Sequence, residues 1–351
     1  MKNFFSLLLM SVLIINVTNA QTQVELGIAG DAYYTTDNDE GRGMGYRPLT
    51  STNVFKDRFG TNNVLLHALA SNENWKANFS IIANGEGTNV LPEEANVGIR
   101  LVEGLWFTGG LFAVWDVNYT FDRWFTGNSL TDYCNMAGPY MAYGLEYNFN
   151  NNVTLAAGFM NSNSEGYFEM PNLSKSIYAK LNWNNCYEDW GITLACITGN
   201  QADYRETHEN ITEIYLATGG TIVRKLEGKL SAKVFMYSID DDNIDNSTAI
   251  TLQALARYRF NKKFAVGARV SFATDTDGLM DVNGTGLDLG LVWEYNPVPY
   301  AYLRVEGGVL SLSNSDNENI AKRFSNNEES TRLGIAISTG FRLGLLQTEI
   351  K

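Results

Sequence analysis

The chain has 351 residues, of which 44% are hydrophobic and 12% aromatic, and its formal net charge at pH 7 is −13. A charge this negative argues against nucleic acid as a partner, because contacts with phosphate groups need lysine and arginine. The three cysteines, Cys134, Cys186 and Cys196, are too few for a disulfide framework, and their spacing matches no metal motif.

The first 20 residues have the pattern of a secretory signal peptide. Lys2 precedes an apolar run from Phe4 to Val17, and Thr18-Asn19-Ala20 then leads to Gln21. This run is too short to span a bilayer as a helix, and no later stretch reaches 18 consecutive apolar residues. We therefore expect a signal peptide over residues 1–20 and a mature chain over 21–351, the alternative being an uncleaved N-terminal anchor.

Along the mature chain, runs of alternating apolar and polar residues are separated by Asn, Asp, Gly and Ser, a pattern typical of strands and turns. The expected strands, in chain order, are Val24–Thr36, Thr61–Ser71, Trp75–Gly85, Ala95–Leu101, Leu105–Phe112, Pro139–Phe149, Val153–Ser162, Ser176–Asn184, Trp190–Gly199, Ile211–Arg224, Leu226–Ile239, Thr248–Phe260, Phe264–Asp275, Gly286–Tyr295, Ala301–Leu312 and Thr331–Leu345. An even number of strands, here about sixteen, is typical of bacterial outer-membrane barrels.

The last of these runs, Thr331–Leu345, alternates without interruption. Large apolar residues and threonine occupy one face, whereas Arg, Gly, Ala and Ser occupy the other. The run is longer than most strands of soluble proteins but suits a tilted strand that crosses a bilayer. The sequence therefore predicts an all-β fold, a transmembrane antiparallel up-and-down β-barrel.

The connections between the expected strands alternate in length. Tight turns such as Asn72-Glu73-Asn74 and Asn261-Lys262-Lys263 are followed, one strand later, by longer polar loops such as 86–94 and 276–285. Transmembrane barrels carry short turns on one rim and long loops on the other, and a soluble sandwich has no reason to keep this asymmetry.

The connection from 113 to 138 breaks the pattern, because it is long, aromatic and poorly alternating. One hypothesis is that this segment folds inward and narrows the pore, and the alternative is an ordinary external loop. The candidate constriction residues are Trp115, Asp116, Tyr119, Arg123 and Trp124.

If one face of each strand meets lipid, the period of two places the other face in the lumen. A charged side chain at the bilayer midplane costs about 2–4 kcal/mol, so the charged residues of the strands should point inward. The pore-lining candidates are Lys229, Lys233, Arg257, Arg259, Arg269, Asp288, Glu294, Arg304, Glu306, Arg332 and Arg342.

Cations outnumber carboxylates on the inward face, whereas acidic residues gather in loops such as Ser238–Asp245. Rings of charged side chains set the ion preference of a pore, so a weak preference for anions is one hypothesis. The alternative is that inward Arg and Glu residues pair across strands and only solvate the wall.

Signals of catalysis are weak. The two histidines, His67 and His208, belong to no readable Ser/His/Asp arrangement, and no nucleophile elbow or glycine-rich phosphate loop is found. We expect no catalytic residue, no metal site and no cofactor.

Several short segments, in the same order along the chain, resemble the OmpL-like β-barrel porins of the outer membrane. They are Leu105–Phe112, Gly138–Leu145, Val153–Asn161 and the strand exit Phe272–Gly278. Two features depart from that family's pattern. Ala113-Val-Trp-Asp-Val replaces a proline-rich segment after the first motif, and the chain ends on Gln347–Lys351 rather than on an aromatic residue.

The resemblance implies a pore in the outer membrane of a Gram-negative cell that passes small hydrophilic solutes by passive diffusion. It also implies outer-membrane lipid and the barrel assembly machinery as partners, with a homo-oligomer possible in principle. The competing hypotheses are a barrel with an adhesive or structural role and, further from the pattern, an outer-membrane barrel enzyme.

Overall fold

The computed structural model describes residues 22–37, 58–84, 90–112, 125, 140–150, 152–161, 176–185, 190–202, 209–239, 246–275, 284–314 and 331–350. The described residues form no helix that is long and apolar enough to cross a membrane. The expected signal peptide, residues 1–20, lies outside the described ranges.

The described residues form sixteen strands. In chain order they are β1 (Thr22–Asp37), β2 (Arg58–Ser71), β3 (Trp75–Asn84), β4 (Val90–Val102), β5 (Leu105–Phe112), β6 (Tyr140–Asn148), β7 (Val153–Met160), β8 (Ser176–Asn185), β9 (Trp190–Ala202), β10 (Glu209–Val223), β11 (Leu226–Ile239), β12 (Ser247–Arg259), β13 (Phe264–Asp275), β14 (Gly284–Val298), β15 (Ala301–Asn314) and β16 (Thr331–Ile350).

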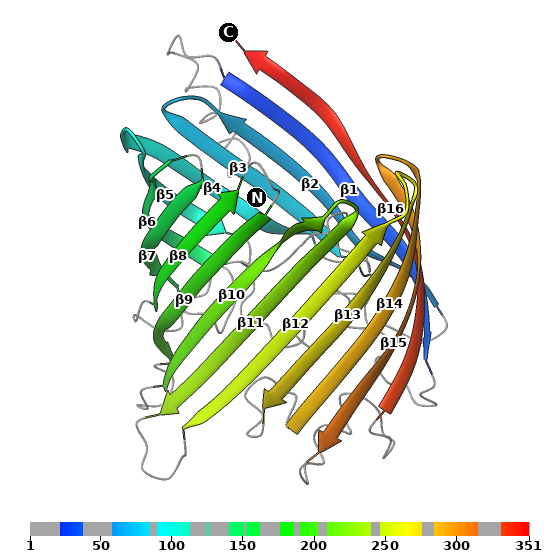
Figure 1. Cartoon of the computed structure of the whole chain (residues 1–351). Helices are drawn as coiled ribbons and strands as arrows, with labels where there is room; N and C mark the ends of the chain where they lie inside the picture. The colour runs from blue at the N-terminus through cyan, green and yellow to red at the C-terminus, as the bar shows by residue number, and fades with distance from the viewer. Residues whose placement is uncertain are drawn as a thin grey trace.

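Each strand pairs in antiparallel fashion with its neighbours in the chain, and β1 pairs with β16, so the sheet closes into a barrel (Figure 1). The register between the first and last strands runs from Thr22 opposite Ile350 to Asp37 opposite Gly334. The predicted all-β, sixteen-strand, up-and-down barrel is confirmed.

The two faces of the wall differ in exposure as the alternating sequence predicts. On β14, Leu289 and Leu291 point outward and are 42% and 65% exposed, whereas Asp288 and Val292 point inward and are 2% and 3% exposed. On β16, Leu333, Ile335 and Ile337 are exposed, whereas the residues between them are buried. The outside of the barrel is therefore an apolar surface that suits lipid.

Two strands extend five residues beyond the predicted limits, further than the others. β4 begins at Val90, five residues before the expected start, and a register shift opposite Pro92 explains why the alternation is hidden there. β16 continues to Ile350, after a register shift that sets Leu26 opposite Leu346 but Gly27 opposite Gly344. Both irregularities are β-bulges, which interrupt the period of two without ending the strand.

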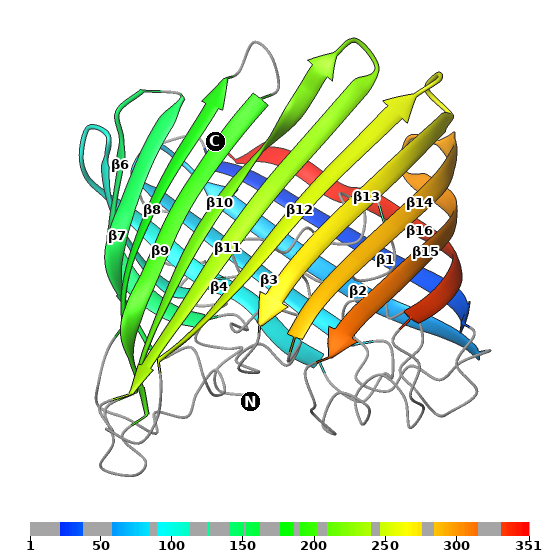
Figure 2. The same ribbon diagram turned by 60° about the horizontal axis from the view of Figure 1, so that its bottom comes forward.

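The short turns gather on one rim, called here the turn rim, which carries the turns after β2, β4, β6, β8, β10, β12 and β14. Figure 2 shows the β10–β11 and β12–β13 turns together at its upper edge. Three of these turns use the same device, in which an asparagine Oδ1 accepts hydrogen bonds from the backbone N–H groups two and three residues later. The asparagines are Asn72, Asn150 and Asn261.

Exposed and half-buried aromatic rings cluster on the outer face near the turn rim. Tyr147 and Phe149 meet edge to face with centroids 4.7 Å apart, and Phe264 stacks on Tyr295 at 4.9 Å. Tyr258 and Phe260 form a further edge-to-face pair at 5.2 Å. Such rings are typical of the girdle that marks the boundary between lipid and water, which places this rim at a membrane surface.

We predict that arginine at Leu291, in the middle of β14, lowers the free energy of unfolding by about 2–4 kcal/mol, because it places a charge at the bilayer midplane. Val223, the last residue of β10, is similarly exposed at 59% but lies at the turn rim. There, arginine should cost about 0–1 kcal/mol. Guanidinium unfolding of protein folded into lipid vesicles measures both values; equal losses at the two positions would contradict the assignment of the outer face to lipid.

Candidate pore lining

Charged side chains on the inward face of β11, β12, β14 and β15 form a network near the turn rim. Glu227 on β11 lies opposite Arg257 on β12, whose Nη2 is 2.6 Å from Glu227 Oε2, and Arg259 Nε donates to Glu227 Oε1 at 2.7 Å. Glu294 on β14 lies opposite Arg304 on β15, whose Nε donates to Glu294 Oε2 at 2.7 Å.

Arg257 connects the two halves of this network. Its Nη1 lies 3.8 Å from Glu294 Oε1, while its other nitrogens contact Glu227. The side chains of Arg304 and Glu294 are only 2% and 6% exposed. Burial removes water that would otherwise screen these charges, so their mutual pairing fixes the positions of the guanidinium groups.

Tyr302 carries the network across the closing seam of the barrel. The guanidinium carbon of Arg304 lies 3.8 Å from the centre of the Tyr302 ring, and the Tyr302 hydroxyl donates to Asp31 Oδ2 on β1 at 3.1 Å. The ring passes over Gly340 of β16, where a Cβ atom would lie 2.5 Å from it. A glycine at this inward position therefore leaves the space that the contact needs.

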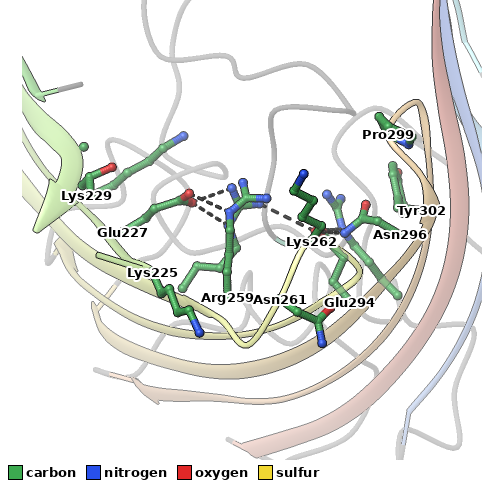
Figure 3. Close-up of a pocket in the computed structure, with 14 residues that line it drawn as sticks. Lys225, Glu227, Lys229, Arg259, Asn261, Lys262, Glu294, Asn296, Pro299 and Tyr302 are labelled. Carbon is green, nitrogen blue, oxygen red and sulfur yellow. Dashed lines mark hydrogen bonds and ion pairs between the residues drawn. The ribbon is translucent and has the colours of Figure 1, made fainter. Parts of the chain in front are cut away.

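These residues surround a cavity of about 860 Å³ at the turn rim (Figure 3). Its lining comprises six cationic side chains and two carboxylates, together with polar and small residues. The cationic residues are Lys225, Lys229, Arg257, Arg259, Lys262 and Arg304. The cavity is thus strongly positive, although the whole chain is acidic.

A second network lies deeper in the barrel, around Arg269 of β13. Arg269 Nε is 2.9 Å from Asp288 Oδ2, and its Nη1 is 3.8 Å from Glu306 Oε1. The three side chains are at most 3% exposed. In addition, the guanidinium carbon lies 4.7 Å from the centre of the Phe125 ring.

Phe125 is the one residue of the segment 113–138 that the structure describes. It is 5% exposed and packs against Val292, with Leu255 also in contact. A Cβ atom at the inward-facing Gly290 would lie 3.2 Å from its ring. Phe125 thus packs against the inner face of the barrel wall.

Part of the opposite inner wall, on β6 to β9, is apolar, which the sequence did not suggest. Ala142, Met160, Tyr178 and Ile197, from β6 to β9, form a buried cluster with Phe112 and Ala156 at its edge. Each of the four is at most 6% exposed, so the inward face is not uniformly wet.

The predicted pore-lining residues fall into four groups. Lys229, Arg257, Arg259, Glu294 and Arg304 line the cavity, and Arg269, Asp288 and Glu306 form the deeper network. Lys233 is 2% exposed, with its ammonium 5.8 Å from the Tyr215 ring centre. Arg342 is exposed near the end of the regular alternation. For Arg332 the structure describes the backbone but not the side chain.

Sequence reasoning missed several wall residues. Lys262, Asn296 and Tyr302 line the cavity, and Glu94 and Asp275 extend the inward face with further carboxylates. Lys262 and Asn296 lie in or beside turns and Glu94 lies at a β-bulge, where alternation gives no direction, whereas Tyr302 and Asp275 are in phase with inward residues of their strands. The constriction candidates Trp115, Asp116, Tyr119, Arg123 and Trp124 all lie outside the described residues.

Comparison with protein families gives a match over residues 23–343 to the model described as "Putative beta-barrel porin-2, OmpL-like". The chain belongs to this family of β-barrel porins. It is an integral protein of the outer membrane, and its function is that of a porin, the passive diffusion of solutes. None of the curated proteins compared matches the chain in sequence.

Solved structures with a similar fold are outer-membrane proteins. The anion-selective porin from Comamonas acidovorans is 10% identical, with a TM-score of 0.62 over 92% of this chain and 99% of that one. The trimer form of OmpT from Vibrio cholerae is 9% identical, with a TM-score of 0.62 over 92% and 99% of the two chains. OmpF from Salmonella typhi, in complex with daunomycin, is 9% identical, with a TM-score of 0.62 over 91% and 97%.

We predict that Arg269→Met lowers the free energy of unfolding by about 3–5 kcal/mol, because it removes the cation that contacts both buried carboxylates, Asp288 and Glu306. Arg259→Gln serves as the control. The Arg259 side chain is 39% exposed and Glu227 keeps Arg257, so this loss should stay below about 1 kcal/mol. Denaturant unfolding in lipid vesicles compares the two variants, and a smaller loss for Arg269→Met would show that the deeper network contributes little.

Proposed function

We propose that this porin passes small hydrophilic solutes through its lumen without energy coupling and weakly prefers anions. The observation that carries the proposal is the cavity at the turn rim, where six cationic side chains face two carboxylates. A solute that uses the lumen must pass this rim. The cationic lining raises the local concentration of anions there and lowers that of cations.

The remainder of the described wall is closer to neutral, which keeps the preference weak. Arg269 faces both Asp288 and Glu306, and Lys76 on β3 pairs with Glu146 at 2.7 Å. Pairing across strands, the alternative interpretation of the charged wall, therefore applies to the wall outside this cavity. The surplus of positive charge is concentrated at the turn rim.

We further propose that the segment 113–138 enters the lumen and narrows it. The contact of Phe125 with Arg269 and Val292 supports this proposal, because all three meet on the inner side of the wall. Inward glycines at 267 and 290 leave room beside the ring. A segment held at this point would reduce the cross-section that is open to solutes.

We infer that the barrel has no catalytic role of its own. His67 Nε2 lies 3.7 Å from Glu25 Oε1, and its ring packs so closely over Gly27 that a Cβ atom there would lie 2.5 Å away. This contact between β1 and β2 is typical of wall packing. His208 lies outside the described residues.

As partners we propose outer-membrane lipid, the barrel assembly machinery and further copies of this chain. The apolar outer face supports the first of these, and a structurally similar outer-membrane protein is described in a trimer form. Chemical crosslinking in native membranes tests this self-association by showing whether the chain is a monomer or an oligomer.

Reversal potentials across a planar bilayer with a KCl gradient test the ion preference. We expect a small shift toward the chloride equilibrium potential, because the turn rim carries surplus positive charge. A clear shift toward the potassium potential would contradict the proposed preference, whereas a complete lack of conductance in folded protein would favour an adhesive or structural role.

We predict that Phe125→Ala raises the single-channel conductance, because the aromatic contact that holds the segment against the wall is lost. Phe107→Ala is the matched control, since Phe107 is 44% exposed on the outer face of β5 and should leave conductance unchanged. Single-channel recordings compare the two variants with the parent protein. Equal conductance in all three would show that Phe125 anchors no constriction.

A further inference from the structure

The cavity at the turn rim holds more positive charge than its own carboxylates can pair. Glu227 and Glu294 are both engaged by arginines, and the lining still has a surplus of four positive charges. One cation, Lys225, is held at the turn, where its ammonium donates to the Phe260 carbonyl at 3.1 Å. The others lie on three strands and one turn around the same space.

The geometry of the arginines suits an oxyanion. Arg257 and Arg259 converge on Glu227 with N–O distances of 2.6–2.8 Å, the spacing of charge-assisted hydrogen bonds. A planar guanidinium matches carboxylate and phosphate groups through two parallel N–H donors. The ammonium groups of Lys229 and Lys262 project on either side of Arg259 (Figure 3). The lining therefore combines directional donors with flexible point charges.

The size of the cavity suits a small molecule. Its volume of about 860 Å³ lies within the roughly 300–1,000 Å³ of ligand pockets. The positive groups are distributed around this space, so an ion with one negative charge contacts only some of them. An anion with several charged oxygens can contact Arg259, Lys229 and Lys262 together.

We propose that this cavity is a binding site for small oxyanions with two or more negative charges, such as polyphosphates. The inference rests on the proposed function, because it assigns a solute class to the same lumen. Such anions bind at the turn rim and compete with smaller anions for passage. Binding remains weak enough for release, because the Glu227 and Glu294 carboxylates occupy part of the same donors.

Pyrophosphate is a suitable probe. We expect it to reduce the chloride current of the folded pore in a saturable manner in planar bilayers. The variant Lys229→Gln/Arg259→Gln/Lys262→Gln removes three cations but keeps Arg257 and Arg304, which hold the two carboxylates. It should need roughly tenfold more pyrophosphate for the same block, since charge-assisted contacts to the anion are lost.

Lys76→Gln is the matched control, because Lys76 is an inward cation at the start of β3, outside this cavity, with its side chain 40% exposed. The block should change little in this variant. The shift of electrophoretic mobility on heating reports whether each variant is folded. A shift of the block that is equal per removed charge in the two variants would overturn the proposed site, because it would reflect the overall charge of the lumen.

Calorimetric titration of pyrophosphate into detergent-folded protein separates the site from the pore. Saturable heat in the parent protein and its loss in the triple variant support the site, whether or not the barrel conducts. Absence of such heat in the parent overturns it. A protein that conducts chloride but shows no binding thus contradicts this inference alone, whereas binding without conductance contradicts the proposed function alone.

Discussion

The backbone hydrogen bonds between the first and last strands are the interaction on which the rest of the structure depends. Hydrocarbon offers no partner to an exposed N–H or C=O group, so a membrane-spanning sheet needs a closed ladder. Strands β1 and β16 supply that closure along almost their whole lengths, from Thr22 opposite Ile350 to Asp37 opposite Gly334. Once the ladder is closed, alternation alone divides every strand between lipid and lumen.

Closure also creates side-chain contacts that a separate hairpin could not form. Tyr302 and Asp31 are 271 positions apart in the chain, yet their side chains meet because β15 and β1 lie on either side of β16 in the closed sheet. Arg257 of β12 likewise links carboxylates on different strands: Glu227 on the neighbouring β11, and Glu294 on β14, beyond β13. The charged cavity is therefore a product of the barrel, and local unfolding of this wall would disperse its cations.

The strands could be predicted from the sequence wherever the alternation was regular and turn residues bounded it. The predicted limits of β5, β11 and β13 match the structure to the residue. Alternation gave no guide at Pro92, where a bulge shifts the register, or in turns such as that of Lys262. For the candidate site, the inward direction of the arginines could be predicted, because a charged side chain is unfavourable in lipid. Which carboxylate each arginine contacts, and the role of Phe125, depend on closure and on segments without periodicity.

The division of each strand between lipid and water is tested most directly by single cysteines placed along β14 of a variant in which the three native cysteines are serine. A fluorophore attached at successive positions from 287 to 292 is measured in vesicles that contain spin-labelled lipid. The structure predicts strong quenching at 287, 289 and 291 and weak quenching at 288, 290 and 292, because the former face the hydrocarbon. Uniform quenching, or quenching in the opposite phase, would contradict the account.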